Sequence, residues 1–233
     1  MALPKIDLPI FELELPSSGE KVKYRPFTVK EEKILLVAQE SKDATQEVLA
    51  SKQIVNNCLI DKDVADLPMF DLEYVLLILR SKSVDNNIGF NIKDPDTEED
   101  IKLSLDLDTI TLTHYPGHSN EIKVNDDYTL YLKYPTIDQF LQIVQTDSND
   151  PLLNYLMMVT CLDKLASEDE VHKFSDYSNN DIDAFMDGLD GTIIKQIQKF
   201  FETMPKLRHE MPYTNSEGKE QVFVVEGMRS FFT

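Results

Sequence analysis

Two histidines, His114 and His118, lie four positions apart on either side of the sequence YPG. Imidazole nitrogens at this spacing can begin a zinc site, which Asp126 or Asp127 could complete with carboxylate oxygens. The pair falls in a predicted loop rather than on one face of a helix, and no cysteine is near it in the sequence. We therefore predict a polar loop that holds no metal ion, and we expect no cofactor elsewhere in the chain.

Acidic residues crowd the stretch 94–100, DPDTEED, as they do at the start of a calcium-binding loop. The stretch lacks the glycine that such a loop needs at its sixth position, and Leu105 stands where the bidentate glutamate would be. We therefore predict a solvated acidic turn. Four further aspartates recur at the spacing of an amphipathic helix and are not predicted to bind a metal ion: Asp181, Asp183, Asp187 and Asp190.

Motifs for catalysis are absent from the sequence. The chain has only 7 glycines and no glycine-rich phosphate loop, and it contains neither G-x-S-x-G nor H-E-x-x-H. Cys58 and Cys161 each lie in an apolar stretch predicted to be helical, where cysteine usually behaves as a small hydrophobic residue. We therefore predict that both thiols are reduced and that the chain is not an enzyme.

The composition is strongly acidic. Asp and Glu number 42 against 23 Lys and Arg, so the net charge is −19 over 233 residues. Proteins that bind nucleic acid need a basic surface to release counterions, so we expect no direct contact with nucleic acid. The acidity serves either solubility or the binding of a basic partner, and the sequence leaves both open. We expect no membrane contact, because no apolar run approaches 18 residues and the first 15 residues are unlike a signal peptide.

The elements that position these residues begin with the stretch 21–41. Alternating apolar and charged residues predict a strand at 20–25, which forms a hairpin with 10–15. Pro26 ends the strand, because proline has no N–H to donate to a sheet. The capping box Thr28-x-x-Glu31 then begins a helix whose apolar stripe is Ile34, Leu35, Val37 and Ala38.

Further helices are predicted where apolar residues recur every three or four positions. Their expected starts are the cap Asp43, Pro68 in a first turn, the capping box Thr136-x-x-Gln139, the pair Asp150-Pro151, and the caps Ser178 and Thr192. The second of these helices, 68–82, is apolar nearly all round and is predicted to be central. A long apolar helix is predicted at 152–165.

The hydrophobic period changes to two between residues 101 and 132, which predicts four short strands in one antiparallel sheet. A second hairpin is predicted from 208–213 and 221–225, around the turn 215–218. The chain is therefore predicted to be an α+β protein, mainly helical, with an inserted small antiparallel sheet and N- and C-terminal hairpins. The predicted domains are an N-terminal hairpin plus helical part at 1–89, the inserted β region at 90–134, and a C-terminal helical part with a hairpin at 135–233.

The stretch PSSGEKVKYRPFTVKEEKILLVAQES, residues 16–41, resembles the baseplate hub assembly proteins of T-even-like contractile-tailed bacteriophages. Three later stretches fit the same resemblance in order: FDLEYVLLILRSKSV at 70–84, LKYPTID at 132–138 and VEGMRSFF at 225–232. The part from about 90 to 130 is the least similar. The family brings no catalytic residue with it.

The resemblance implies a non-enzymatic assembly factor, or a structural component of the tail baseplate hub, that acts by protein–protein binding. The implied partners are other baseplate hub or tail proteins, and an oligomer within the hub is left open. The implied location is the host cytoplasm during assembly, or the tail baseplate of the virion. Two alternatives come from other classes: an acidic inhibitor that mimics nucleic acid, and a hydrolase with a dispersed site.

Partner-binding residues are predicted at the two ends of the sequence. Ile10, Leu13 and Leu15 belong to an N-terminal arm that could add a strand to a neighbouring protein. Phe231 and Phe232 either dock into the core of the chain, which the adjacent strand favours, or into a partner.

Overall fold

The computed structural model of the chain describes residues 7–41, 43–144 and 153–231. The chain forms two compact units, one from Met1–Thr113 with Lys206–Thr233 and the other from His114–Pro205. We call them unit 1 and unit 2. Helices make up 42% and strands 27%, and the strands of the described residues form four sheets. The fold is therefore mixed α+β, and the prediction of a mainly helical chain is wrong.

Unit 1 is built on three helices, α1 (Val29–Ser41), α2 (Ala44–Cys58) and α3 (Met69–Ser83), with α2 packed against both of the others. The predicted N-terminal hairpin is confirmed, because β1 (Phe11–Glu14) pairs antiparallel with β2 (Lys21–Tyr24). A short 3-10 helix, η1 (Val64–Asp66), precedes α3.

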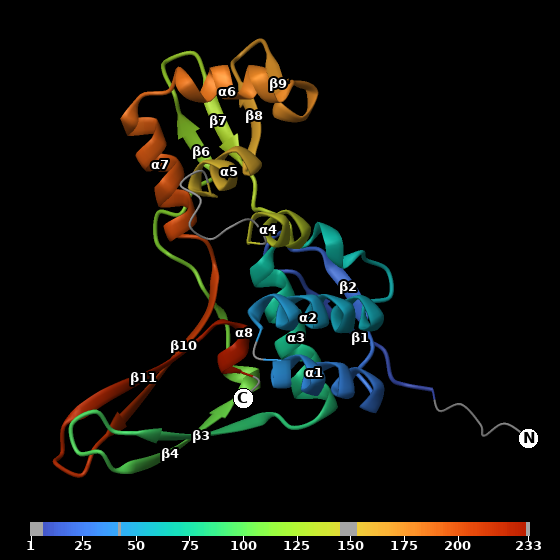
Figure 1. Cartoon of the computed structure of the whole chain (residues 1–233), viewed down its shortest axis with the longest axis vertical. Coiled ribbons are helices and arrows are strands. Elements are labelled where there is room, and N and C mark those ends of the chain that lie inside the picture. The colour runs from blue at the N-terminus through green and yellow to red at the C-terminus, as the bar shows by residue number, and fades with distance from the viewer. Residues whose placement is uncertain (1–6, 42, 145–152, 232–233) are drawn as a thin grey trace, which may run out of the picture. The chain divides into compact units, whose positions relative to one another are not determined.

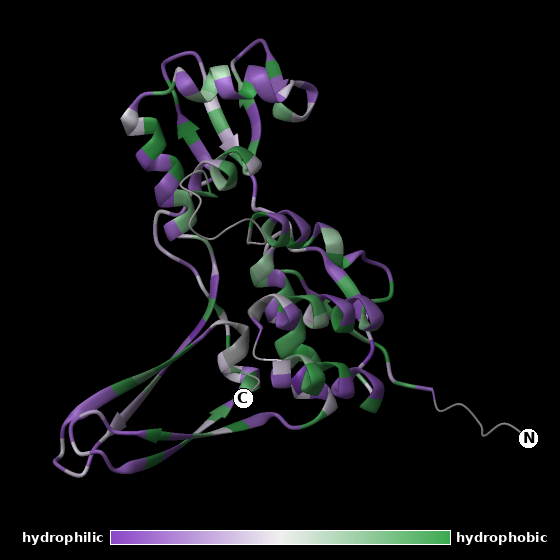
Figure 2. Cartoon of the chain, in the orientation of Figure 1, coloured by the Kyte–Doolittle hydropathy of each residue, from purple (hydrophilic) through white to green (hydrophobic). Residues whose placement is uncertain are grey.

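Helix α3 supplies much of the core of unit 1, as its all-round apolar sequence predicted. Leu72, Val75, Leu76, Leu77 and Leu79 are all buried. The hydropathy colouring in Figure 2 shows α3 as largely hydrophobic. A helix that is apolar on every face is stable in water only where other elements surround it.

Two long hairpins complete unit 1. Strand β3 (Asn87–Lys93) pairs with β4 (Asp100–Asp106), and β10 (Lys206–Thr214) pairs with β11 (Glu220–Glu226), which confirms the predicted C-terminal hairpin. β10 also pairs with the two-residue strand β5 (Leu112–Thr113), which follows the 3-10 helix η2 (Leu107–Thr109). Figure 1 shows both hairpins extending away from the helices and meeting at their tips. The short helix α8 (Gly227–Ser230) follows β11 and contacts α3 and β10.

Unit 2 contains one antiparallel sheet in the order β6-β7-β8-β9. Its strands are Glu121–Lys123, Thr129–Leu132, Leu162–Ala166 and Val171–Lys173. Its helices are α4 (Ile137–Val144), α5 (Leu153–Thr160), α6 (Asn179–Asp187) and α7 (Gly191–Glu202), and η3 (Phe174–Asp176) is a 3-10 helix.

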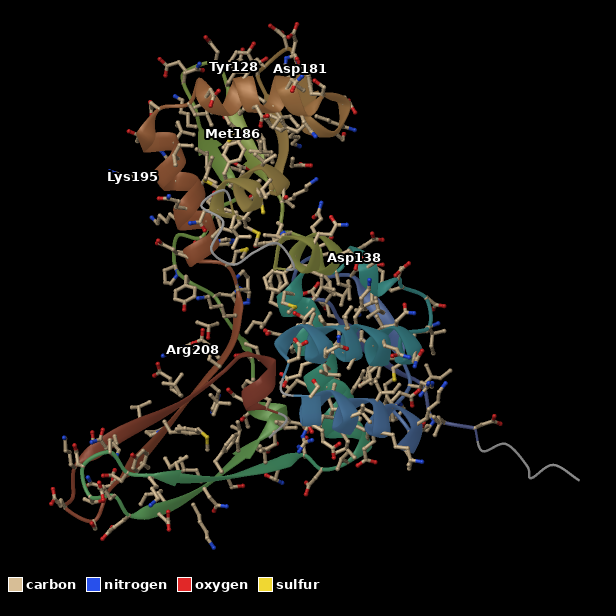
Figure 3. All side chains as sticks on the ribbon, in the orientation of Figure 1. Tyr128, Asp138, Asp181, Met186, Lys195 and Arg208 are labelled. Carbon is tan, nitrogen blue, oxygen red and sulfur yellow. The ribbon has the colours of Figure 1, made fainter. Side chains whose placement is uncertain are left out.

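The core of unit 2 lies between its sheet and helices and includes Leu130, Leu132, Ile197 and Phe200. Met186 of α6 is buried in this core, whereas Asp181 on the same helix and Lys195 on α7 are exposed (Figure 3). The core draws its residues from unit 2 alone.

The four strands predicted between 101 and 132 do not form one inserted sheet. They are divided among three sheets: β4 pairs with β3, β5 pairs with β10, and β6 and β7 join β8 and β9. The helix predicted at 152–165 is also wrong at its end, because α5 stops at Thr160 and β8 begins at Leu162. Leu130 and Leu165 are opposite each other in the β7–β8 register, so β8 replaces the last turn of the expected helix with pairing to β7.

Several predicted helix starts are confirmed, although Pro68 is the N-cap residue of α3 and not part of its first turn. Asp43 caps α2, the amide oxygen of Gln139 accepts from the backbone of Thr136, and Ser178 with Asp181 forms a complete capping box on α6. The cap of α7 is Asp190 rather than Thr192, because the Asp190 carboxylate accepts from the Thr192 and Ile193 amides. The predicted cap at Asp150-Pro151 lies outside the described residues.

Candidate partner-binding sites

The residues predicted to bind partners lie in different environments. Ile10 is 62% exposed, ahead of β1, whereas Leu13, Leu15 and Phe231 are buried in unit 1. Phe232 lies outside the described residues. Of the described members of this set, only Ile10 presents its side chain to a partner without a change in unit 1.

His118 makes structural contacts in unit 2. Its Nε2 is 2.8 Å from the Tyr134 hydroxyl and its Nδ1 is 2.9 Å from the Thr203 hydroxyl. The ring also stacks on Phe200 at 5.2 Å between centroids. Burial, and then the nearby His114, lower the pKa of His118. No group of three potential metal ligands occurs among the described residues.

In the acidic turn after β3, Asp94 is only 1% exposed and Thr97 is half-buried, whereas the other residues are exposed. The prediction of a solvated turn is therefore wrong at Asp94. The Asp94 carboxylate accepts from the Asp96 and Thr97 amides, from the Tyr213 hydroxyl at 2.9 Å and from the Asn215 side chain. Burial favours a higher pKa for Asp94, but these hydrogen bonds outweigh it and lower the pKa to about 2.

Asp96 extends this link between the two hairpins, since its carboxylate accepts from Lys219 at 2.5 Å and from Gln221 at 2.6 Å. Phe90 of β3 and Phe223 of β11 add a ring contact at 5.5 Å. The acidic turn therefore joins the tips of the two hairpins through its own hydrogen bonds.

An apolar groove lies between α1 and α2. Its volume is about 570 Å³, and Ile34, Val37 and Leu49 are among its lining residues. Val37 was predicted to face the core, but its side chain is 69% exposed, and the adjacent Leu36 is exposed as well. The sequence hints at this surface through three consecutive apolar residues, Leu35, Leu36 and Val37. Consecutive residues of a helix point in different directions, so one buried face cannot cover all three.

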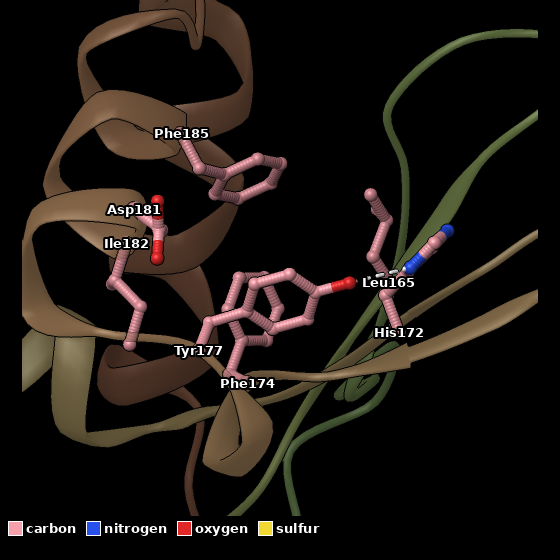
Figure 4. A pocket seen from close by; sticks show the side chains of 7 residues that line it. All are labelled: Leu165, His172, Phe174, Tyr177, Asp181, Ile182 and Phe185. Atoms are coloured by element: carbon pink, nitrogen blue, oxygen red, sulfur yellow. Dashed lines mark hydrogen bonds between the residues drawn. The ribbon is translucent and has the colours of Figure 1, made fainter.

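A second pocket, in unit 2, has a volume of about 250 Å³ and is mostly apolar. Its lining comes from η3, α6 and the neighbouring strands β8 and β9, and three of its residues are aromatic: Phe174, Tyr177 and Phe185 (Figure 4). The sequence indicated only that Phe185 lies on the apolar face of an amphipathic helix, and it gave no sign that Phe174 and Tyr177 join it in a pocket.

Both cysteines are buried and free, as predicted. Burial raises the pKa of Cys58 to about 11 and that of Cys161 to about 12. Thiols with such pKa values are protonated at neutral pH and are poor nucleophiles. Within the described part of the chain, no helix has the length and apolar character to cross a membrane.

The chain matches a protein-family model over nearly its whole length. The model of the family described as T4 bacteriophage base plate protein matches residues 8–233, which include all four stretches that carry the resemblance seen in the sequence. No curated protein and no solved structure matches the chain. Since the match covers essentially the whole sequence, the chain belongs to the T4 bacteriophage base plate protein family.

Proposed function

We propose that this baseplate protein is a non-enzymatic assembly factor, or a structural component, of the baseplate hub and acts by protein–protein binding. The observation that carries the proposal is the family match over residues 8–233. The hub assignment rests on the four similar stretches of sequence, of which 16–41 is the longest. The partners are other hub or tail proteins.

The groove between α1 and α2 supports this proposal. Single exposed apolar residues are common on protein surfaces, but here Val37 and Leu49 line one groove and Leu36 is exposed beside them. The polar lining of the groove includes Lys33, Ser41 and Gln46 and carries no carboxylate. An apolar segment of another baseplate protein, with no need for a matching charge, is the occupant that fits it.

Substitution of Val37 tests this role. A phage that lacks this protein would be complemented with Val37→Asp, and we expect a large loss of infectious particles together with loss of the baseplate proteins that copurify with the wild type. Ile60→Asp is the matched control, because Ile60 is an exposed apolar residue of unit 1 outside the groove. Full complementation by a correctly folded Val37→Asp protein would contradict the role of the groove.

A second measurement separates the two forms of the proposal. Mass spectrometry of purified virions and of infected-cell lysates would compare the amount of this protein with that of known tail proteins. Retention at a fixed ratio in virions supports a structural component, whereas presence in the lysate alone supports an assembly factor. If the protein copurifies with no baseplate protein in either sample, the proposed binding function is wrong.

A further inference from the structure

The pocket of unit 2 combines aromatic rings with a carboxylate. Phe174 of η3 and Phe185 of α6 form adjacent walls, with their ring centroids 5.1 Å apart and their planes at 58°. Tyr177 supplies the third ring, and Asp181 lies on the same side of the pocket as Phe185 (Figure 4). Aromatic faces carry negative electrostatic potential and attract cations, most strongly where water is partly excluded.

Hydrogen bonds hold the third ring in place. The Tyr177 hydroxyl is 2.7 Å from Nδ1 of His172, and Nε2 of His172 is 3.2 Å from a carboxylate oxygen of Glu170. Tyr177 is nevertheless 45% exposed. A side chain that is fixed in position yet open to solvent can take up a ligand without rearranging.

Asp181 has one oxygen available to a ligand. Its Oδ2 accepts from the amide and the hydroxyl of Ser178 in the cap of α6. Among the described residues, nothing donates a hydrogen bond to Oδ1. The cap therefore fixes the carboxylate beside the rings and leaves its Oδ1 able to accept a hydrogen bond from a ligand.

The surroundings of the pocket are strongly acidic. Residues 162–190 contain nine carboxylates against two lysines, a net charge of −7 with histidine neutral. The two lysines, Lys164 and Lys173, are paired in the β8–β9 register, as are Leu165 and His172. Because side chains alternate along a strand, both lysines face away from the pocket that Leu165 and His172 line, and Lys164 lies over the Tyr131 ring instead.

The size of the pocket decides what kind of ligand fits. Small-molecule sites usually enclose roughly 300–1,000 Å³. At about 250 Å³, this pocket is below that range and suits a single side chain. A planar guanidinium can stack on a ring while its N–H groups reach Oδ1 of Asp181, a combination that the compact ammonium of lysine cannot match.

We propose that this pocket binds an arginine side chain of a partner baseplate protein. The proposal rests on the proposed function, because it assumes that the chain acts by binding other proteins. It adds a second, charge-selective contact to the apolar groove of unit 1 and gives the acidity of the chain a specific use.

Peptide binding to the full-length protein tests the proposal directly and does not depend on the groove. The probes are acetyl-Gly-Arg-Gly-amide, the same peptide with the neutral isostere citrulline, and tetramethylammonium. Binding is followed by NMR of the aromatic rings. We expect the arginine peptide to shift the Phe174, Tyr177 and Phe185 signals saturably, and the citrulline peptide to have at most a small effect.

Two pairs of variants distinguish the contribution of the Tyr177 ring to binding from that of the Asp181 charge. Tyr177→Leu should weaken binding of the arginine peptide by roughly two- to fivefold, whereas Tyr177→Phe, which keeps the ring but loses its hydrogen bond to His172, should weaken it less. Asp181→Asn keeps an acceptor for the helix cap but removes the charge, so it should also weaken binding. Asp187→Asn is the matched control, because Asp187 is on the same helix but does not line the pocket.

Equal binding of the arginine and citrulline peptides, or no shift of the three rings with either, would overturn the proposal. So would binding of tetramethylammonium without binding of arginine, which would indicate a free quaternary ammonium ligand. Failure of these peptide experiments leaves the proposed hub function standing, because that function is tested by copurification and by the Val37→Asp variant.

Discussion

The two most informative residues of unit 1 are Glu31 and Asp94, whose carboxylates are buried and accept several hydrogen bonds each. Glu31 is 1% exposed and accepts from the Thr28 amide at 2.8 Å, the Thr28 hydroxyl at 2.6 Å and Arg25 at 3.1 Å. The sequence predicted that Glu31 reaches back to Thr28, and this is confirmed. The Thr28 hydroxyl both donates to Glu31 and accepts from the Lys30 amide at 3.3 Å. The ion pair with Arg25 was not predicted, because the six-residue spacing carries no helical signal.

This cluster predicts unequal effects of substitution. Thr28→Ala should lower the free energy of unfolding by about 1 kcal/mol, the usual loss of an N-cap. Glu31→Ala should cost more, about 2 kcal/mol, because it removes the bonds that Glu31 accepts from Arg25 and from Thr28. Denaturant midpoints of the two purified variants would measure the difference. Equal midpoints would mean that the Arg25–Glu31 pair adds nothing beyond the cap.

Acid should destabilise the chain through these same carboxylates. Burial opposes the charged form of Glu31, but its bonds to Arg25 and Thr28 prevail and lower its pKa to about 2, as hydrogen bonds do for Asp94. A depressed folded-state pKa gives stability that is present above the unfolded pKa, about 4, and is lost as the pH falls towards 2. We expect the urea midpoint to fall between pH 5 and pH 2. In Asp94→Asn this fall should be smaller, and an unchanged fall would exclude Asp94 as a contributor.

At the scale of elements, the two hairpins of unit 1 depend on each other. Two-stranded ribbons are only marginally stable alone in water. The β3–β4 ribbon turns Ile88, Phe90 and Ile92 to one face, and the contact of Phe90 with Phe223 brings β11 against that face. Asp94 and Asp96 then join the tips through Tyr213, Asn215 and Lys219.

Loss of the Asp94 link should loosen both hairpins together. In Asp94→Ala we expect faster amide hydrogen exchange in β3, β4, β10 and β11, because each ribbon loses its contact with the other at the tip. Exchange in the β6–β9 sheet of unit 2 serves as the internal control and should not change. If only the turn at 94–99 exchanges faster, the hairpins are stable independently and the link is merely local.

Local signals in the sequence predicted the elements that depend on neighbouring residues. Caps such as Asp43 and Ser178, and the hairpin around 215–218, depend on residues a few positions apart and were read correctly. Strand pairings between residues far apart in the sequence were not predicted correctly. β8 was read as helix because its apolar residues continue those of α5, and β5 pairs with β10, more than 90 residues later. The aromatic pocket was missed because Phe174, Tyr177 and Phe185 come together only when η3 packs beside α6.

At the scale of the whole molecule, unit 2 is an insertion between two paired strands of unit 1. The chain leaves unit 1 after Thr113 and returns at Lys206, and these two residues are opposite each other in the β5–β10 register. The aromatic and aliphatic core of unit 2 is made entirely from residues between them.

Unit 2 should therefore fold without unit 1. A fragment of residues 114–205 is expected to unfold cooperatively and to keep the dispersed NMR spectrum of a packed core, since none of its core residues is contributed by unit 1. Circular dichroism against temperature and an amide NMR spectrum would test this. A fragment without a cooperative transition would show that unit 2 needs the rest of the chain.

The net charge of −19 makes a final prediction about binding, because the two proposed surfaces should respond differently to salt. The screening length falls from about 10 Å at 0.1 M salt to about 3 Å at 1 M. Contacts through the acidic pocket of unit 2 should weaken over this range and association with a basic hub partner should slow markedly, while dissociation changes less. The groove of α1 and α2 has no carboxylate in its lining, so part of the affinity should persist at 1 M.

Binding kinetics with a purified partner, measured from low to high salt, would give both the salt-sensitive and the salt-insensitive part of the affinity. Rates that do not change from low to high salt would assign the acidity to solubility and leave binding to the apolar groove alone.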